Sequence, residues 1–353
     1  MIELTTIKYF EYTPNYRDQV IKLLVEQGMT EEKFTWRYER APYSNKSLLF
    51  LATFKDRVIG FRGLVQQKFK SESQTINVFS PCDAFVDKGF RRIGLMTHLN
   101  MFMIDKIKDE FGSESIILNL SSNEYSTPGY LKQGWVSMDA MKQYLHKVSL
   151  AGAFNQFLYN VGFIKKRSEK RFNMQKENEF LEIRQPSRLI YKDLVNFNFN
   201  LNETRITNNR DEAFYNWRYS FEKEKYLFVL KFENSQIKSY VILQKASSFK
   251  YFIAEYASQS HIDMQQMLNF ASCKYGIPYM TLFSLTLNDS ELQKFKNVGF
   301  MPESWFLQKL FKKQRLPALV RLVEHKAEEK LYFANSKDIR NYQSWNIQFS
   351  DVH

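Results

Sequence analysis

Cysteine is almost absent from this chain, which has two cysteines in 353 residues. Cys82 and Cys273 lie far apart and neither belongs to a CxxC pair, so the sequence predicts neither a disulfide scaffold nor a structural zinc site. No apolar run approaches the ~18–20 residues that a membrane-spanning helix needs. The first residues also lack the basic and apolar regions of a secretory signal peptide. We therefore expect a cytoplasmic protein without a metal cofactor.

Glycine is scarce too, at 12 residues. Basic residues are abundant, because 50 lysines and arginines against 38 aspartates and glutamates give a net charge of +12. The basic residues are spread along the chain, so we do not predict a nucleic-acid-binding protein, and a small polyanionic ligand suits the charge. The 32 phenylalanines and 20 tyrosines favour well-packed aromatic cores over disorder. A chain of this length exceeds what one core usually supports, which predicts two domains.

The second half of the chain repeats the order of elements in the first half. Trp-Arg-Tyr occurs at 36–38 and again at 217–219, which we interpret as structural aromatic packing with a paired arginine. Lining of an acceptor pocket is the alternative role in the first copy. The corresponding expected elements are 48–54 and 226–232, 58–67 and 237–243, 95–110 and 267–275, 115–120 and 279–285, and 130–135 and 295–300. Mixed strands and helices in each copy predict an α/β (α+β) fold with two duplicated domains. We place the domains at 1–172 and 173–335, and a tail at 336–353.

The segment 83–99 organises the first copy. An apolar strand ends in a basic turn, and an amphipathic helix follows. The N–H groups of a first helical turn have no intrahelical partner and attract anions. Gly94 allows a phosphate to approach the backbone closely, and Arg91 and Arg92 add positive charge. The turn is therefore predicted to hold a pyrophosphate.

Two motifs in this region resemble signatures of the GNAT superfamily of N-acetyltransferases. The acyl-CoA motif of that family is similar to Val86-x-x-x-Phe90-Arg91-x-x-Gly94-x-Met96, although the family has glycine or alanine in place of Met96. The second signature is similar to Asn123-x-x-Ser126-x-x-x-Tyr130-x-x-x-Gly134-Trp135. The resemblance implies two tandem GNAT-like domains, each a mixed, mostly antiparallel sheet flanked by helices.

The resemblance also implies which residues bind acyl-CoA, by default acetyl-CoA, as co-substrate. They are Phe85, Val86, Arg91, Arg92, Ile93, Gly94, Leu95, Met96 and Asn123. A strand N–H near Phe85 or Val86 would hold the oxyanion of the tetrahedral intermediate. Asn123 is expected to bond the pantetheine arm, or else to cap the helix that it begins. The implied acceptor is a primary amine, such as an amino sugar or nucleotide-linked amino sugar of surface-polysaccharide synthesis.

The implied catalytic residues are Tyr130 and Asp83. Tyr130 stands where the family places the general acid that protonates the leaving thiolate, a task that suits a phenol. Packing in the core is the alternative role for Tyr130. Asp83 is the candidate general base or amine-binding carboxylate, with a structural role at the strand end as its alternative. Glu255 (which corresponds to Asp83 and is expected to face a shared cleft), Asp351 and the C-terminal carboxylate are further candidates for the base.

The second copy lacks these features. Its turn at 257–263 has neither glycine nor arginine, and Phe295 replaces the tyrosine, so this copy is expected to be degenerate and to bind no CoA. It would shape the acceptor site or support the first copy. Two other functions remain open, namely a non-catalytic CoA- or anion-binding sensor and aminoacyl transfer from aminoacyl-tRNA on a related double fold.

One further segment combines apolar and basic residues. An apolar stripe over 153–164 is followed by Lys165-Lys166-Arg167, which predicts an amphipathic basic helix. This helix suits a membrane surface, but a counterpart at 316–322 favours packing at the domain interface.

Overall fold

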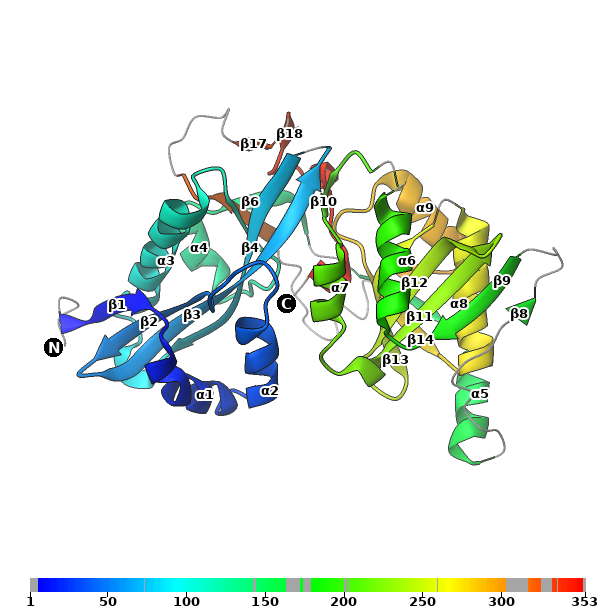
Figure 1. Ribbon diagram of the computed structural model, residues 1–353, viewed down its shortest axis with the longest axis horizontal. Coiled ribbons are helices and arrows are strands. Elements are labelled where there is room, and N and C mark those ends of the chain that lie inside the picture. Colours follow the sequence, from blue (N-terminus) through cyan, green and yellow to red (C-terminus); the bar gives the residue numbers. More distant parts are fainter. Residues whose placement is uncertain are drawn as a thin grey trace.

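Two helix-covered sheets form the two halves of the molecule (Figure 1). The computed structural model describes residues 6–72, 74–141, 144–162, 172–173, 179–199, 201, 203–258, 260–302, 317–324, 332–334 and 336–351. Both sheets are mixed and mostly antiparallel, with a parallel pair in the middle of each, so the predicted fold class is confirmed.

The first sheet has the order β1-β2-β3-β4-β5-β16-β6. Its strands are β1 (Lys8–Glu11), β2 (Leu49–Phe54), β3 (Arg57–Ser71), β4 (Gln74–Val86), β5 (Ile116–Asn119), β16 (Pro317–Leu322) and β6 (Val136–Met141). Its helices are α1 (Arg17–Val25), α2 (Glu31–Phe34), α3 (Leu95–Phe111) and α4 (Thr127–Lys132). The helix predicted after the basic turn therefore begins where the sequence places it.

Side chains that alternate along β2 give this sheet an apolar layer on each face. Leu49 and Leu51 belong to the core that contains residues of α1 and α2, whereas Phe50 and Ala52 belong to the core that contains residues of α3. Figure 1 shows α1 and α3 on opposite sides of the sheet. This sandwich fixes the basic turn between the end of β4 and the beginning of α3.

The second sheet has the order β15-β7-β14-β13-β12-β11-β9-β8. Its strands are β15 (Met301–Pro302), β7 (Tyr144–Val148), β14 (Tyr279–Phe283), β13 (Lys250–Ala257), β12 (Gln236–Lys245), β11 (Tyr226–Glu233), β9 (Glu179–Arg184) and β8 (Phe172–Asn173). The accompanying helices are α5 (Leu150–Asn160), α6 (Arg188–Phe199), α7 (Glu212–Arg218), α8 (His261–Tyr275) and α9 (Asp289–Asn297). The duplicated order of elements is thus present in the structure.

Each sheet contains a strand from the other half of the chain. β16 lies between β5 and β6, and β7 lies between β14 and β15, with antiparallel pairing throughout. The successive strands β6 and β7 therefore belong to different sheets. The domain bounds 1–172, 173–335 and 336–353 stay predictions. The first sheet combines strands from both ends of the chain, whereas every strand of the second sheet lies between Tyr144 and Pro302.

Two short strands add further links between the halves. β10 (Ile206–Asn208) pairs with β3 of the first sheet, and β19 (Trp345–Asn346) of the tail pairs with β10. The tail then ends, within the described residues, in a short 3-10 turn at Phe349–Asp351. The chain beyond 200 thus contributes to both sheets.

Trp36 and Trp217 join the two halves in a reciprocal contact. Their rings stack with 5.0 Å between centroids and 10° between planes, and each indole Nε1 donates a hydrogen bond of 2.8 Å to the carbonyl oxygen of the other residue. Both side chains are buried. Corresponding residues that contact each other in this way are typical of local two-fold symmetry. The interpretation of the repeated Trp-Arg-Tyr as structural packing is confirmed.

We expect the Trp36→Ala variant to lose about 3–5 kcal/mol of unfolding free energy, because the change removes a buried indole and its hydrogen bond. Urea unfolding followed by circular dichroism measures this loss. Trp217→Ala should cost a similar amount, and the double variant less than the sum, since both single changes break the same pair. Tyr125→Ala is the control, because Tyr125 is 86% exposed. An unchanged midpoint for Trp36→Ala would contradict the contact.

Candidate active site

The parallel strands β4 and β5 separate where β4 approaches the basic turn. They pair only at Val78–Ile116 and Phe79–Ile117, whereas β4 continues to Val86. The Ser121 hydroxyl then donates to the Pro81 carbonyl oxygen at 3.2 Å, at the point of separation. Beyond it, no strand among the described residues pairs with β4 on this side. Backbone groups that β4 directs to this side can bond an extended ligand, except the Val86 carbonyl oxygen, which accepts from Arg91.

Asp83 forms a bulge in this stretch of β4. Its neighbours pair with Arg62 and Gly63 of β3, whereas Asp83 itself has no partner in the ladder and has a φ of +36°. A φ in the left-handed region is unfavourable for most side chains but tolerated by aspartate. The bulge turns the Asp83 side chain toward residues of the Trp-Arg-Tyr segment.

The Asp83 carboxylate is bonded through one of its oxygens. Oδ2 accepts a hydrogen bond of 2.6 Å from Arg37 Nη1 and one of 2.5 Å from the Tyr38 hydroxyl. Burial, with the nearby Cys82 and Asp83, raises the pKa of Tyr38 well above its usual value. A Cβ at Gly63 would lie 2.1 Å from the Tyr38 hydroxyl oxygen, so glycine is required there. The sequence indicated Asp83 but not these partners.

Tyr130 lies in α4 with its ring in the core and its hydroxyl against an arginine of β3. The Tyr130 ring packs on Trp135 at 5.0 Å, and the hydroxyl oxygen accepts a hydrogen bond of 2.7 Å from Arg62 Nη2. Both Tyr130 and Arg62 are buried. Because the oxygen accepts from Arg62, its own proton is free for donation elsewhere. Arg62 is a site residue that the sequence did not reveal.

Pro128 does not kink α4, although it stands close to Tyr130. The helix begins at Thr127, so Pro128 occupies the first turn, where no intrahelical N–H bond is lost. Asn123 precedes this helix and its Oδ1 accepts hydrogen bonds from the backbone N–H groups of Tyr125 and Ser126. Asn288 caps the corresponding helix α9 in the second half. Asn123 thus closes the turn that precedes α4, whose N-cap is Ser126, and contact between Asn123 and pantetheine stays a prediction.

The basic turn between β4 and α3 is an exposed, ordered structure. Asp87 Oδ1 accepts from the Gly89 N–H at 2.8 Å, and Gly94, with a φ of +87°, caps α3. Arg92 also has a positive φ, of +66°, and Arg91 Nε donates to the Val86 carbonyl oxygen at 3.1 Å. Arg91, Arg92 and Gly94 are exposed.

Hydrophobic residues anchor this turn from beneath. Leu95 is buried, and Ile93 and Met96 pack against the same core. The core thus accommodates Met96 where the resembling family has a small residue. Nothing lies within 3.8 Å of a Cβ placed at Gly94, so space remains above the helix N-terminus.

In the second half, β13 and β14 also separate, but the tail of the chain lies against the unpaired part of β13. The side chain of Gln348 accepts a hydrogen bond of 2.7 Å from the Tyr256 N–H and donates one of 3.1 Å to the Tyr256 carbonyl oxygen. Ile347 exchanges similar bonds with the Thr286 hydroxyl, at 2.9 and 3.2 Å. Residues of the tail therefore take the backbone bonds that β4 leaves open in the first half.

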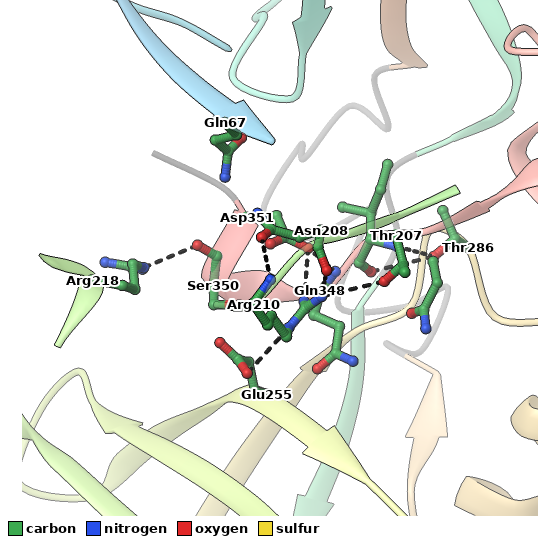
Figure 2. A network of polar contacts seen from close by, with 12 residues as sticks. Gln67, Thr207, Asn208, Arg210, Arg218, Glu255, Thr286, Gln348, Ser350 and Asp351 are labelled. Atoms are coloured by element: carbon green, nitrogen blue, oxygen red, sulfur yellow. Dashed lines mark hydrogen bonds and ion pairs between the residues drawn. The ribbon is translucent and has the colours of Figure 1, made fainter. Parts of the chain in front are cut away.

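Arg210 holds this tail through a buried ion-pair network (Figure 2). Its Nη2 lies 3.0 Å from Asp351 Oδ2, and its Nε lies 3.2 Å from Glu255 Oε2. Glu255 and Asp351 are 0% and 1% exposed, and burial raises the pKa of Asp351. The expectation that Glu255 faces a shared cleft is therefore wrong, because both carboxylates are enclosed with their cation. The C-terminal carboxylate lies outside the described residues.

A polar cavity of about 340 Å³ lies beside the tail. Arg205 on its wall forms ion pairs of 3.0 Å with Glu203 and 2.8 Å with Glu291. These paired charges differ from the exposed arginines of the turn in the first half. Within the described residues, no cluster of His, Cys, Asp and Glu suits a metal ion. Among the same residues, no helix is long and apolar enough to cross a membrane.

Solved structures of other proteins share the fold of this chain, whereas sequence comparisons find no match. No family model matches the sequence, and no curated protein matches it either. A probable N-acyltransferase of unknown function from Enterococcus faecalis has a TM-score of 0.61 at 9% identity, over 90% of this chain and 73% of that chain. A GCN5-related N-acetyltransferase from Anabaena variabilis has a TM-score of 0.60 at 10% identity, over 90% and 73%. A tandem GNAT protein from the clavulanic acid pathway has a TM-score of 0.54 at 8% identity, over 91% and 99%.

The chain has the tandem GNAT fold. The likeness covers nearly the whole chain and, at these low identities, it concerns the fold alone. Within that fold Asp83, Phe85 and Val86 lie on the part of β4 that pairs with β3 but has no partner on the β5 side among the described residues. Arg62 connects Tyr130 to this part of β4. Its guanidinium donates to the Tyr130 hydroxyl, and its backbone pairs with Ala84 in the β3–β4 ladder. Glu255 and Asp351 belong instead to the network in the second half.

We expect one of the two cysteines to react with Ellman's reagent in the native protein at pH 8. Cys273 is exposed, whereas Cys82 is buried against Tyr38, and burial with the adjacent Asp83 raises the pKa of Cys82 to about 11. A raised thiol pKa leaves little thiolate at pH 8. Absorbance at 412 nm should report about one thiol before denaturation and about two after it. Rapid reaction of both thiols would contradict the packing beneath β4.

Proposed function

We propose that this protein is an N-acyltransferase that moves the acyl group of an acyl-CoA, by default acetyl-CoA, to a primary amine. The observation that carries the proposal is the part of β4 that has no partner on the β5 side within the described residues. This part leads directly into the exposed turn at Gly94 and α3, and no such arrangement occurs in the described part of the second half. An extended pantetheine arm needs free backbone groups, and a pyrophosphate needs a helix N-terminus. The tandem GNAT fold supports the same reading.

The turn supplies what a pyrophosphate requires. The N–H groups from Arg92 to Met96 stand at the positive end of the α3 dipole. Gly94 leaves room for the phosphate oxygens, and the exposed guanidinium groups of Arg91 and Arg92 add charge beside them. Phe85 and Val86, immediately upstream, would bond the pantetheine arm.

The reaction is a direct acyl transfer. The amine nitrogen attacks the thioester carbon, so that a C–N bond forms and, as the tetrahedral intermediate collapses, the C–S bond breaks. An N–H of Phe85 or Val86 would stabilise the oxyanion. The amine loses a proton to Asp83, directly or through water. Both observed bonds to Asp83 use Oδ2, which leaves Oδ1 for this purpose.

Tyr130 would donate its proton to the leaving thiolate. The hydrogen bond from Arg62 keeps the hydroxyl proton directed away from the guanidinium, and the same cation would stabilise the phenolate that remains. The acceptor that we propose is an amino sugar, free or nucleotide-linked, as used in surface-polysaccharide synthesis. The basic charge of the chain suits a diphosphate on that acceptor.

We expect Tyr130→Phe to lower kcat about 100-fold, the usual contribution of a general acid, while the Kd for acetyl-CoA changes less than twofold. Thiol release in the presence of an amine panel measures turnover, and isothermal titration measures affinity. Tyr125→Phe is the matched control at an exposed tyrosine. Normal turnover of Tyr130→Phe would remove the acid role. Tight acetyl-CoA binding without thiol release for any amine would favour a non-catalytic sensor.

Gly94→Glu should abolish acetyl-CoA binding in the same titration, because it places a carboxylate where the pyrophosphate would lie. Gly94→Ala is the control, since it carries the same strain of about 1–2 kcal/mol at positive φ without the charge. We expect Gly94→Ala to weaken binding less than 10-fold. Equal affinities of the two variants would place the pyrophosphate elsewhere.

A further inference from the structure

Helix α5 is attached to the second half by one face. A Cβ at Gly152 would lie 2.2 Å from the Ile277 carbonyl oxygen, so the helix contacts the backbone that follows α8 directly. Asn155 Nδ2 donates a hydrogen bond of 2.6 Å to the Cys273 carbonyl oxygen, and Gln156 is buried on the same side. These contacts fix the rotation of the helix about its own axis.

The opposite face of α5 is apolar and exposed. Leu150, Phe154 and Phe157 are 84%, 61% and 59% exposed, and Val161, just beyond the helix, is 49% exposed. Their spacing of three or four residues aligns them in one stripe. Figure 1 shows α5 extending beyond the body of the second half. We name these four residues the α5 stripe.

Exposed apolar residues continue from the α5 stripe onto the adjoining strands. Val148 ends β7, immediately before the helix, and is 64% exposed. Met301 of β15 pairs with His146 of β7 and is 68% exposed. Scattered apolar residues are ordinary on a surface, but a stripe of four exposed apolar side chains along one helix face marks an interaction site.

The sequences that continue from this patch are strongly basic. Residues 163–171 follow the α5 stripe and residues 303–316 follow β15, and together they contain nine lysines and arginines against two glutamates. More than half of the net charge of +12 therefore lies in these two segments, which corrects the even spread inferred from the sequence. The counterpart expected at 316–322 is also wrong as a helix, because Pro317–Leu322 is strand β16 of the first sheet.

We propose that the α5 stripe docks on the surface of an anionic lipid bilayer. Apolar side chains on a fixed helix would enter the interfacial region, while the neighbouring basic sequences attract anionic headgroups. Basic residues alone would be enough to bind the phosphate backbone of a nucleic acid. The large exposed apolar side chains would have no role in such a complex. Self-association through a second copy is opposed by the net charge of +12 that each copy carries. This inference does not depend on the proposed acyl transfer.

Vesicle co-sedimentation of the full-length protein tests the proposal. Wild-type protein should sediment with vesicles of phosphatidylcholine and phosphatidylglycerol at a 7:3 ratio, remain in solution with phosphatidylcholine alone, and bind less as ionic strength rises. The Phe154→Ser/Phe157→Ser variant should lower the partition coefficient at least 10-fold. Val25→Ser/Ile262→Ser is the matched control, because Val25 and Ile262 are 52% and 54% exposed on other helices. Circular dichroism and thermal melting establish that both variants are folded.

Three outcomes would overturn the proposal. The first is wild-type protein that stays in solution with anionic vesicles. The second is equal sedimentation of the Phe154→Ser/Phe157→Ser variant and the wild type, which would mean that charge alone attracts the protein. The third is a dimer, seen by light scattering of the wild type and absent from this variant, which would assign the α5 stripe to a second copy.

Discussion

The stacked pair of Trp36 and Trp217 determines how the two halves of this molecule meet. Each tryptophan is followed by an arginine and a tyrosine, so the position of the indoles fixes what those neighbours reach. In the first half Arg37 and Tyr38 bond Asp83 at the bulge of β4. In the second half Arg218 donates to the Ser350 carbonyl oxygen and Tyr219 donates to Glu255. One contact thus orients both the bulge near the candidate active site and the tail.

The two halves share a separation of parallel strands and use it differently. In the first half, the part of β4 after Phe79 has no strand partner on the β5 side within the described residues, and an exposed basic turn follows it. In the second half, Gln348 satisfies the corresponding backbone of β13 from within the chain. Backbone hydrogen-bonding groups are costly to leave unsatisfied. The tail therefore satisfies backbone groups in the second half, as a bound ligand would in the first half. One fold thus serves as a scaffold in one copy and as a candidate site in the other.

Much of the fold follows from local patterns in the sequence. The nearly continuous apolar runs of β2 and β11, and the helical spacing of α3 and α8, are properties of neighbouring residues, so these elements were predictable. The exchange of β7 and β16 was not, since an apolar strand has the same pattern in either sheet. Gly94 and the start of α3 were predictable, because a glycine directly before an amphipathic stretch is a local signal. Arg62, Arg37 and the enclosure of Glu255 depend on residues that lie far apart in the chain, and nothing local indicates them.

The exchange of β7 and β16 also affects how the chain can fold. Residues that complete the first sheet are translated after nearly all of the second half, so the space between β5 and β6 stays open until Pro317–Leu322 leaves the ribosome. Contacts between segments so distant in sequence form late in folding. The chain must lose the conformational entropy of the long intervening loop before the contact stabilises the fold. The first half is then not a self-sufficient folding unit, although the sequence looks like two successive domains. A chain that ended after the first half would therefore leave an open gap between β5 and β6.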